Sequence, residues 1–119
     1  MILIRTAEAL ARLVATTDDA TLRNLLAVQA ENLADFDLEE VAILLVVQPH
    51  DTLDDLDAAL GWPVVSCDLF THPAELLERH DHYTVVTFIL SDDGFGVVLY
   101  IPDEATAPLM AACEREGDR

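Results

Sequence analysis

The clearest pattern of apolar and polar positions lies in residues 83–101, where two β-rich runs flank a short polar turn. Branched aliphatic and aromatic residues fill both runs, and the sequence Ser-Asp-Asp-Gly at 91–94 separates them. An Asp-Gly pair between such runs is a strong hairpin signal, because the turn needs positive φ, which glycine adopts without strain. Both faces of each run are largely apolar, as in strands that are covered on both sides. The pattern therefore predicts a central hairpin over residues 83–101.

The remaining apolar pattern predicts helices and one further strand. Residues 41–47 form a short apolar run that is rich in β-branched residues and ends before Pro49, as expected of a buried strand. Residues 1–4 are compatible with a short edge strand or with a simple lead-in. Apolar residues elsewhere recur at helical spacing after residues that can cap or start a helix, namely Thr6, Thr17, Asp51, Thr71 or His72, and Thr106.

These elements predict an α+β fold with a small sheet of three to four strands, mostly antiparallel, packed by about four to five helices. The stretch 48–82 is long enough for a crossover, so one parallel pair of strands is also compatible with the pattern. In the acidic connection at 35–40, we expect Phe36 and Leu38 to anchor the chain to the core. At 119 residues the chain fits one globular domain, 1–119, which can bury roughly two thirds of its unfolded surface.

Composition adds one unusual feature, the net charge. The chain has 23 acidic residues against six arginines and no lysine, which gives a formal net charge of −17. No basic residue occurs from position 24 to position 78, whereas acidic residues are frequent there. Such a field repels nucleic acids and anionic membranes, and it attracts cations and basic protein surfaces. The charge therefore argues against direct nucleic-acid binding, although the same composition also fits acidity that serves only solubility.

Several features predict a cytoplasmic protein without a membrane anchor. The longest apolar run, residues 41–47, is far shorter than the ~20 residues that a membrane-spanning helix needs. The first residues show neither the charged leader nor the apolar stretch of a signal peptide. The two cysteines, Cys67 and Cys113, do not form the pattern of a disulfide framework, so we expect reduced thiols.

Three short segments carry a resemblance to a group of bacterial proteins. They are Gln-Pro-His-Asp-Thr-Leu at 48–53, Gly-Trp-Pro at 61–63 and Ser-Asp-Asp-Gly-Phe-Gly-Val-Val at 91–98. Over residues 38–102 the chain resembles small acidic bacterial proteins, without a known activity, that are encoded on plasmids and other mobile elements. The resemblance implies a bacterial cytosolic setting. Its motifs are turns and helix caps, so it supplies no site residue.

The acidic residues predict a surface that binds a basic partner. An aromatic side chain surrounded by carboxylates is a favourable arrangement for such binding, and Trp62 follows the acidic helix that we expect after residue 51. The partner-binding residues predicted in this way are Glu39, Glu40, Asp51, Asp54, Asp55, Asp57 and Trp62.

A second group of residues allows a different interpretation. Cys67, His72, His80 and His82 are residue types that bind zinc, and two histidines at alternate positions can point to one side of an extended segment. Their spacing matches no common metal motif, and histidines beside a helix end are often solvated. The sequence assigns no catalytic residue and no cofactor.

The interpretation that the sequence favours is a non-enzymatic cytosolic interaction protein whose acidic face docks a basic protein. One form of it is an inhibitor or immunity-type protein that imitates the phosphates of a nucleic acid and binds a nucleic-acid-binding protein. Two alternatives stay open. The first is a small metal-binding protein or enzyme that uses the cysteine and histidine group, and the second is a homodimeric structural protein.

Overall fold

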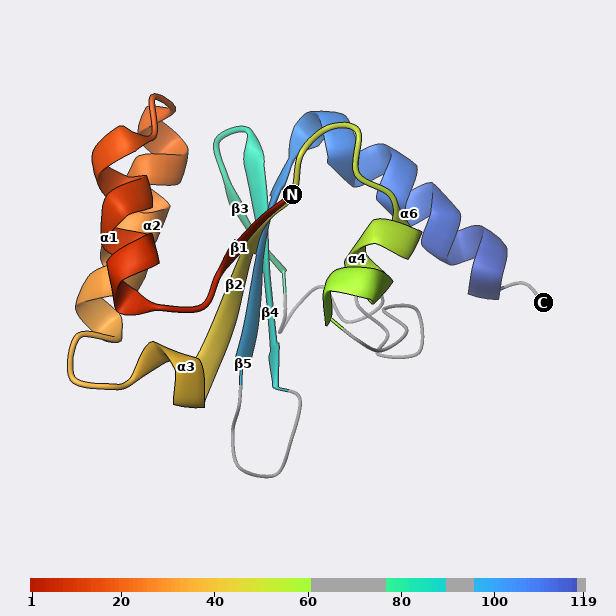
Figure 1. Cartoon of the computed structure of the whole chain (residues 1–119). Helices are drawn as coiled ribbons and strands as arrows, with labels where there is room; N and C mark the ends of the chain where they lie inside the picture. Colours follow the sequence, from red (N-terminus) through yellow and green to blue (C-terminus); the bar gives the residue numbers. More distant parts are fainter. Residues whose placement is uncertain (61–76, 90–95, 118–119) are drawn as a thin grey trace.

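The computed structural model describes residues 1–60, 77–89 and 96–117, and it places helices on both sides of one sheet (Figure 1). The described elements, in chain order, are β1 (Ile2–Ile4), α1 (Ala7–Thr16), α2 (Ala20–Asn32), α3 (Leu38–Val41), β2 (Ala42–Val46), α4 (Leu53–Leu60), β3 (Leu77–His80), β4 (Tyr83–Ile89), β5 (Gly96–Pro102) and α6 (Asp103–Gly117). The fold is therefore α+β, as the sequence pattern predicts.

The strands form one sheet in the order β1-β2-β5-β4-β3. β2 and β5 are parallel, and the other three pairs are antiparallel. β4 and β5 pair along their whole length from Tyr83 opposite Pro102, which confirms the two strands of the predicted hairpin, and their connecting turn lies outside the described residues. β5 is central, and residues 97–101 are all buried, as two apolar faces predict.

Helices cover both faces of the sheet, because successive residues of the central strands alternate between two apolar clusters. In β2, Leu44 packs in the cluster that α1 and α2 cover, whereas Leu45 packs in the cluster under α4 and α6. Figure 1 shows these two helix layers on opposite sides of the strands. No helix in the described ranges is long and apolar enough to cross a membrane.

The described residues form a sheet of five strands, so the predicted number of three to four is too low. Residues 2–4 form a strand because Ile4 enters the core and Ile2 pairs with Val46 of β2. Residues 77–80, which the sequence pattern places at the end of a helix, form β3 and pair with β4. Pairing with a neighbouring strand satisfies the backbone of this segment and overrides its helical pattern of leucines. Among the described strands β2 and β5 form a parallel pair, and the chain between them includes β3 and β4 instead of the predicted crossover 48–82 alone.

The starts of α2 and α6 differ from the prediction by a few residues. Asp19, and not Thr17, caps α2, because Asp19 Oδ1 accepts the Leu22 N–H at 3.1 Å while Thr17 ends α1. α6 begins at Asp103 instead of Thr106, directly after β5. The connection before α2 is therefore longer than predicted, whereas α6 follows β5 without the predicted connection.

Candidate functional site

The acidic residues predicted to bind a partner divide into two groups that lie apart. Glu39 and Glu40 belong to α3, directly before β2, whereas Asp51 and the aspartates of α4 follow β2. β2 has five residues, so its ends are roughly 13 Å apart. The groups also lie in opposite layers, because Leu38 of α3 packs in the cluster of α1 and α2, and Leu56 of α4 packs on the other face. The described members of the predicted site therefore do not form one continuous surface.

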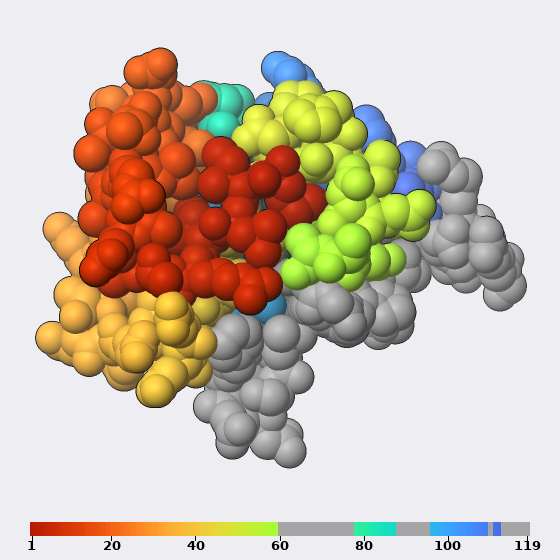
Figure 2. Space-filling model, in the orientation of Figure 1, coloured from red at the N-terminus to blue at the C-terminus, as the bar shows by residue number. Residues whose placement is uncertain are grey.

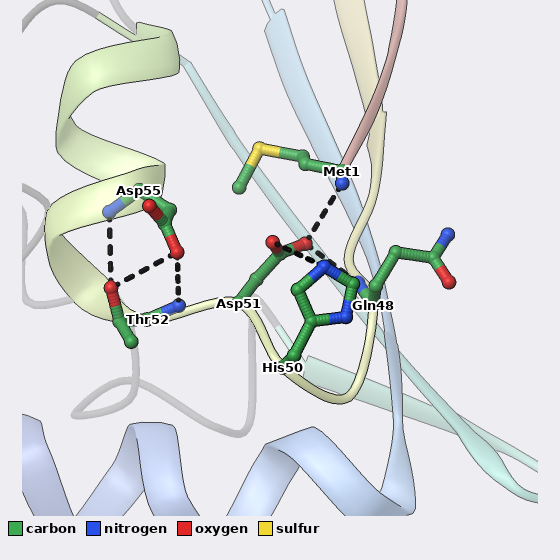
Figure 3. Close-up of polar contacts among 6 residues, drawn as sticks. All are labelled: Met1, Gln48, His50, Asp51, Thr52 and Asp55. Carbon is green, nitrogen blue, oxygen red and sulfur yellow. Dashed lines mark hydrogen bonds and ion pairs between the residues drawn. The ribbon is translucent and has the colours of Figure 1, made fainter.

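Asp51 is a buried residue with structural contacts (Figure 3). Its side chain is 6 % exposed, and its Oδ2 accepts the Gln48 N–H at 2.8 Å. The same oxygen lies 3.2 Å from the N-terminal ammonium of Met1, and the imidazole of the exposed His50 is 3.7 Å from Oδ1. The carboxylate joins the start of β1 to the loop between β2 and α4, and it presents almost no surface to a partner.

Thr52 and Asp55 form a reciprocal cap at the start of α4 (Figure 3). Thr52 Oγ1 accepts the Asp55 N–H at 3.3 Å, and Asp55 Oδ2 accepts the Thr52 N–H at 2.9 Å. The Thr52 N–H, with its hydroxyl, lowers the pKa of Asp55. The prediction that Asp51 caps this helix is therefore wrong. Asp57 is also engaged within the protein, whereas Asp54 is exposed.

Three residues named by the sequence analysis are not placed by the structure. Trp62, Cys67 and His72 lie outside the described residues. Their proposed roles, as an aromatic anchor and as metal ligands, stay predictions.

The structure instead gathers exposed acidic and apolar residues on the segment from the end of α2 through α3. We call this the α2–α3 surface, and its members are Val28, Glu31, Asp35, Phe36, Asp37, Glu39 and Glu40. Leu33 is partly buried and Leu38 is buried in the same core cluster. Because these two leucines point inwards, the polar residues between and beside them face solvent.

Phe36 is the residue of this surface that the sequence pattern misplaces. The sequence pattern predicts Phe36 in the core, but its side chain is 58 % exposed, whereas Leu38 is 2 % exposed as predicted. The Phe36 N–H donates to the Leu33 carbonyl at 3.0 Å and closes a turn at the end of α2. The flanking aspartates, Asp35 and Asp37, are the sequence feature that indicates an exposed Phe36, because a side chain between two carboxylates is difficult to bury.

The negative charge of the α2–α3 surface has little compensation nearby. No basic residue occupies the last turn of α2, although the carboxyl end of a helix favours cations. Glu31 and Asp35 thus lie at the negative end of the helix dipole. Arg23, near the other end of α2, donates to a main-chain carbonyl at 3.4 Å, and Arg79 pairs with Asp103 at 2.6 Å.

His80 and His82, the described members of the second predicted group, each face a carboxylate. His80 Nε2 lies 3.3 Å from Glu78 Oε2, and His82 Nε2 lies 2.5 Å from Asp19 Oδ2. The hydrogen bond to Asp19 raises the pKa of His82, and the same bond lowers the pKa of Asp19. Within the part of the chain that the structure describes, no group of three or more histidine, cysteine, aspartate or glutamate side chains could hold a metal ion.

The turn between β3 and β4 is attached to the start of α2. The Thr21 hydroxyl donates to Asp81 Oδ2 at 2.8 Å, beside the contact between Asp19 and His82. Asp81 has a φ of 53°, in the left-handed region that aspartate tolerates better than most residues. The Asp103 N–H also donates to the His82 carbonyl at 2.9 Å. These contacts position the turn between β3 and β4 against the start of α2 and the start of α6.

Comparisons with protein-family models, with curated proteins and with solved structures give no match to this chain. The resemblance of residues 38–102 to small acidic bacterial proteins therefore stays a prediction. The exposed side chains of the α2–α3 surface are the features that bear on function.

Proposed function

We propose that the protein is a non-enzymatic interaction module that binds a basic protein through the α2–α3 surface. The observation that carries the proposal is Phe36, an aromatic side chain that is 58 % exposed between Asp35 and Asp37. Aromatic residues are frequent anchors of protein interfaces, and surrounding charges provide specificity and fast association. Val28, which is 54 % exposed on α2, adds apolar area to the same surface.

The charge of the surface determines the kind of partner. Residues 31–40 include five carboxylates, and no basic residue occurs from position 24 to position 78. A partner rich in lysine and arginine would supply the positive charge that the carboxyl end of α2 lacks. Long-range attraction would also accelerate the encounter at low salt.

A narrower form of the proposal concerns a partner that itself binds nucleic acid. Repeated carboxylates on residues 31–40 would compete with phosphates for the basic surface of such a partner, as in an inhibitor or immunity-type protein. In line with the resemblance of residues 38–102, we place this activity in a bacterial cytoplasm and the gene on a mobile element.

Affinity capture with two charge-matched variants tests the proposal. The immobilised protein is exposed to a bacterial lysate at about 0.05 M and about 0.5 M salt, where screening differs strongly. Affinities for the captured partner are then measured with the natural chain, with a surface variant (Asp35→Asn, Asp37→Asn, Glu39→Gln) and with a control variant of the same net charge. The control carries its substitutions at other exposed carboxylates, namely Asp18→Asn, Asp54→Asn and Glu104→Gln.

We expect the surface variant to bind at least about tenfold more weakly than the control variant, and binding of the natural chain to weaken at high salt. Phe36→Ala, which leaves the charge unchanged, should also weaken binding by about tenfold or more, as for an interface hot spot. Capture of no partner would contradict the proposal. So would equal weakening by the two charge variants, or unchanged binding by Phe36→Ala.

A further inference from the structure

A shallow apolar groove lies between β1 and α1, apart from the α2–α3 surface. It has a volume of about 130 Å³, and its lining includes Ile2, Leu3 and Ile4 of β1 together with Ala9, Arg12 and Leu13 of α1. Figure 2 shows the N-terminal residues, in red, at the surface of the molecule, and no other segment covers them in this view. The groove is therefore open to solvent on this side.

The groove runs along the edge of the sheet. β1 is the first strand in the sheet order, and among the described strands only β2 pairs with it. Its other edge therefore offers backbone N–H and C=O groups for one more strand. Ile2 and Leu3 are 37 % and 39 % exposed, although isoleucine and leucine are commonly buried. An extended peptide can use both features, because its backbone pairs with the edge and alternate side chains enter the groove.

The charges beside the groove are unusual for this protein. Arg5 directly follows β1, and Arg12 lines the groove. Within the described residues, neither guanidinium has a hydrogen bond or an ion pair, even though the chain has a net charge of −17. Glu8 lies one turn before Arg12 on α1, but the two side chains do not form an ion pair in the structure. Arg23 and Arg79, by contrast, have partners in the protein.

We infer that this groove binds an extended acidic segment of a partner protein, which adds a strand to β1. Apolar side chains of the segment would occupy the groove between β1 and α1, and its carboxylates would pair with Arg5 and Arg12. Charge complementarity favours an acidic segment over a basic one. A second copy of the chain is a weaker fit, because its own β1 would bring Arg5 towards the same edge.

The probe is a dye-labelled peptide of about seven residues in which valine alternates with glutamate, a usual length for a strand. A second peptide carries lysine in place of glutamate. Fluorescence anisotropy measures the affinity of each peptide for the full chain, and amide hydrogen exchange follows residues 2–5. We expect the glutamate peptide to bind more tightly than the lysine peptide and to slow exchange at residues 2–5.

Substitutions at the groove should change the affinity for the glutamate peptide in defined directions. Arg12→Ala should weaken binding by about threefold to fivefold, the range for an exposed ion pair, and Arg5→Ala with Arg12→Ala by about tenfold. Glu8→Gln should strengthen binding by about twofold, because it removes a competing carboxylate. Ile2→Glu should weaken binding about tenfold by placing a charge on the edge. Arg23→Ala, on α2, is the control and should leave the affinity unchanged.

Several results would overturn the inference. They are binding of the lysine peptide as tight as that of the glutamate peptide, no binding of either peptide, and an unchanged affinity in the double arginine variant. Sedimentation that shows a dimer of the chain, dissociated by Ile2→Glu, would assign the edge to a second copy instead. Circular dichroism confirms that each variant folds. Because the α2–α3 surface is not altered in any of these variants, failure here leaves the proposed function as it stands.

Discussion

Replacement of Asp51 by asparagine measures how strongly the contact between the N-terminus and the loop after β2 stabilises the fold. The substitution keeps the size of the side chain and retains an oxygen that can accept the Gln48 N–H. It removes the negative charge that lies 3.2 Å from the Met1 ammonium. The main consequence is therefore a partly buried ammonium without its partner.

The expected loss of unfolding free energy follows from the burial of both groups. The Asp51 side chain is 6 % exposed, whereas Met1, whose main-chain ammonium is the partner, is only partly buried as a residue, so solvent screens part of their attraction. Breaking a fully buried pair by removing one partner costs about 3–5 kcal/mol. Since each group retains a little solvent contact, we expect Asp51→Asn to cost about 2–4 kcal/mol. Asp51→Ala should cost about 1 kcal/mol more, because it also removes the acceptor of the Gln48 N–H.

Urea unfolding followed by circular dichroism is the assay. For a domain of this size the slope is roughly 1–1.5 kcal/mol per M, so the midpoint for Asp51→Asn should fall by about 2 M. Asp54→Asn changes the charge equally on an exposed neighbour, and it should shift stability by less than about 0.5 kcal/mol. Equal midpoints for Asp51→Asn and Asp54→Asn would refute the reasoning, and Asp51 would then belong with the acidic surface residues.

Three further predictions concern other contacts. Protonated His82 pairs with Asp19, so its contribution to stability should be present below about pH 6.5 and be lost as the pH rises through its raised pKa. The urea midpoints of the natural chain and of His82→Gln should therefore converge above neutral pH. Tyr100→Phe should leave stability unchanged or raise it by up to about 1 kcal/mol, because the buried Tyr100 hydroxyl has no partner at full hydrogen-bonding geometry within the described residues. Gln29 is near enough to oppose the rise that burial causes in the Tyr100 pKa, so a loss above about 1 kcal/mol by thermal unfolding would show that Gln29 is a true partner. Thr52→Ala should cost about 1 kcal/mol and Thr52→Ser much less, because serine retains the cap; equal losses in the two variants would contradict the capping role.

The strands that the sequence predicts well are those whose pattern has only one interpretation. The run at 41–47 is too short for a helix and apolar on both faces, and it forms β2 in the middle layer. The segment that forms β3 is different, because its leucines also fit one side of a helix. What decides it is pairing between Glu78 and Val85 on β4, a contact between segments that local propensity does not include. The cap of α4 is likewise decided by contacts that the local sequence does not show. Asp51 and Thr52 are both good capping residues, but the Asp51 carboxylate accepts the Gln48 N–H, and Thr52 caps the helix instead.

The candidate site could be predicted in its chemistry but not in its position. The excess of carboxylates from position 24 to position 78 is a property of composition, whereas the exposure of each one depends on its contacts. Asp51 is buried against an ammonium, and Asp55 is hydrogen-bonded to Thr52. Phe36 illustrates the converse, because its hydrophobicity favoured the core and its neighbours kept it outside. Charge counting therefore overestimates how many carboxylates near α4 are free of contacts within the protein, and it takes no account of the exposed Phe36 after α2.

Charged side chains with a partner and those without one have different places in the described structure. Where an arginine of the described chain has a partner, as Arg79 does in Asp103, the contact connects elements of the fold. Within the described residues, two sets of charges without such partners lie beside exposed apolar side chains, namely the carboxylates around Phe36 and the guanidinium groups at Arg5 and Arg12. A protein whose charge served only solubility has no need for exposed apolar side chains beside both sets. Because Phe36 and Ile2 are exposed there, each set has the combination of charge and apolar area that a protein partner would bind.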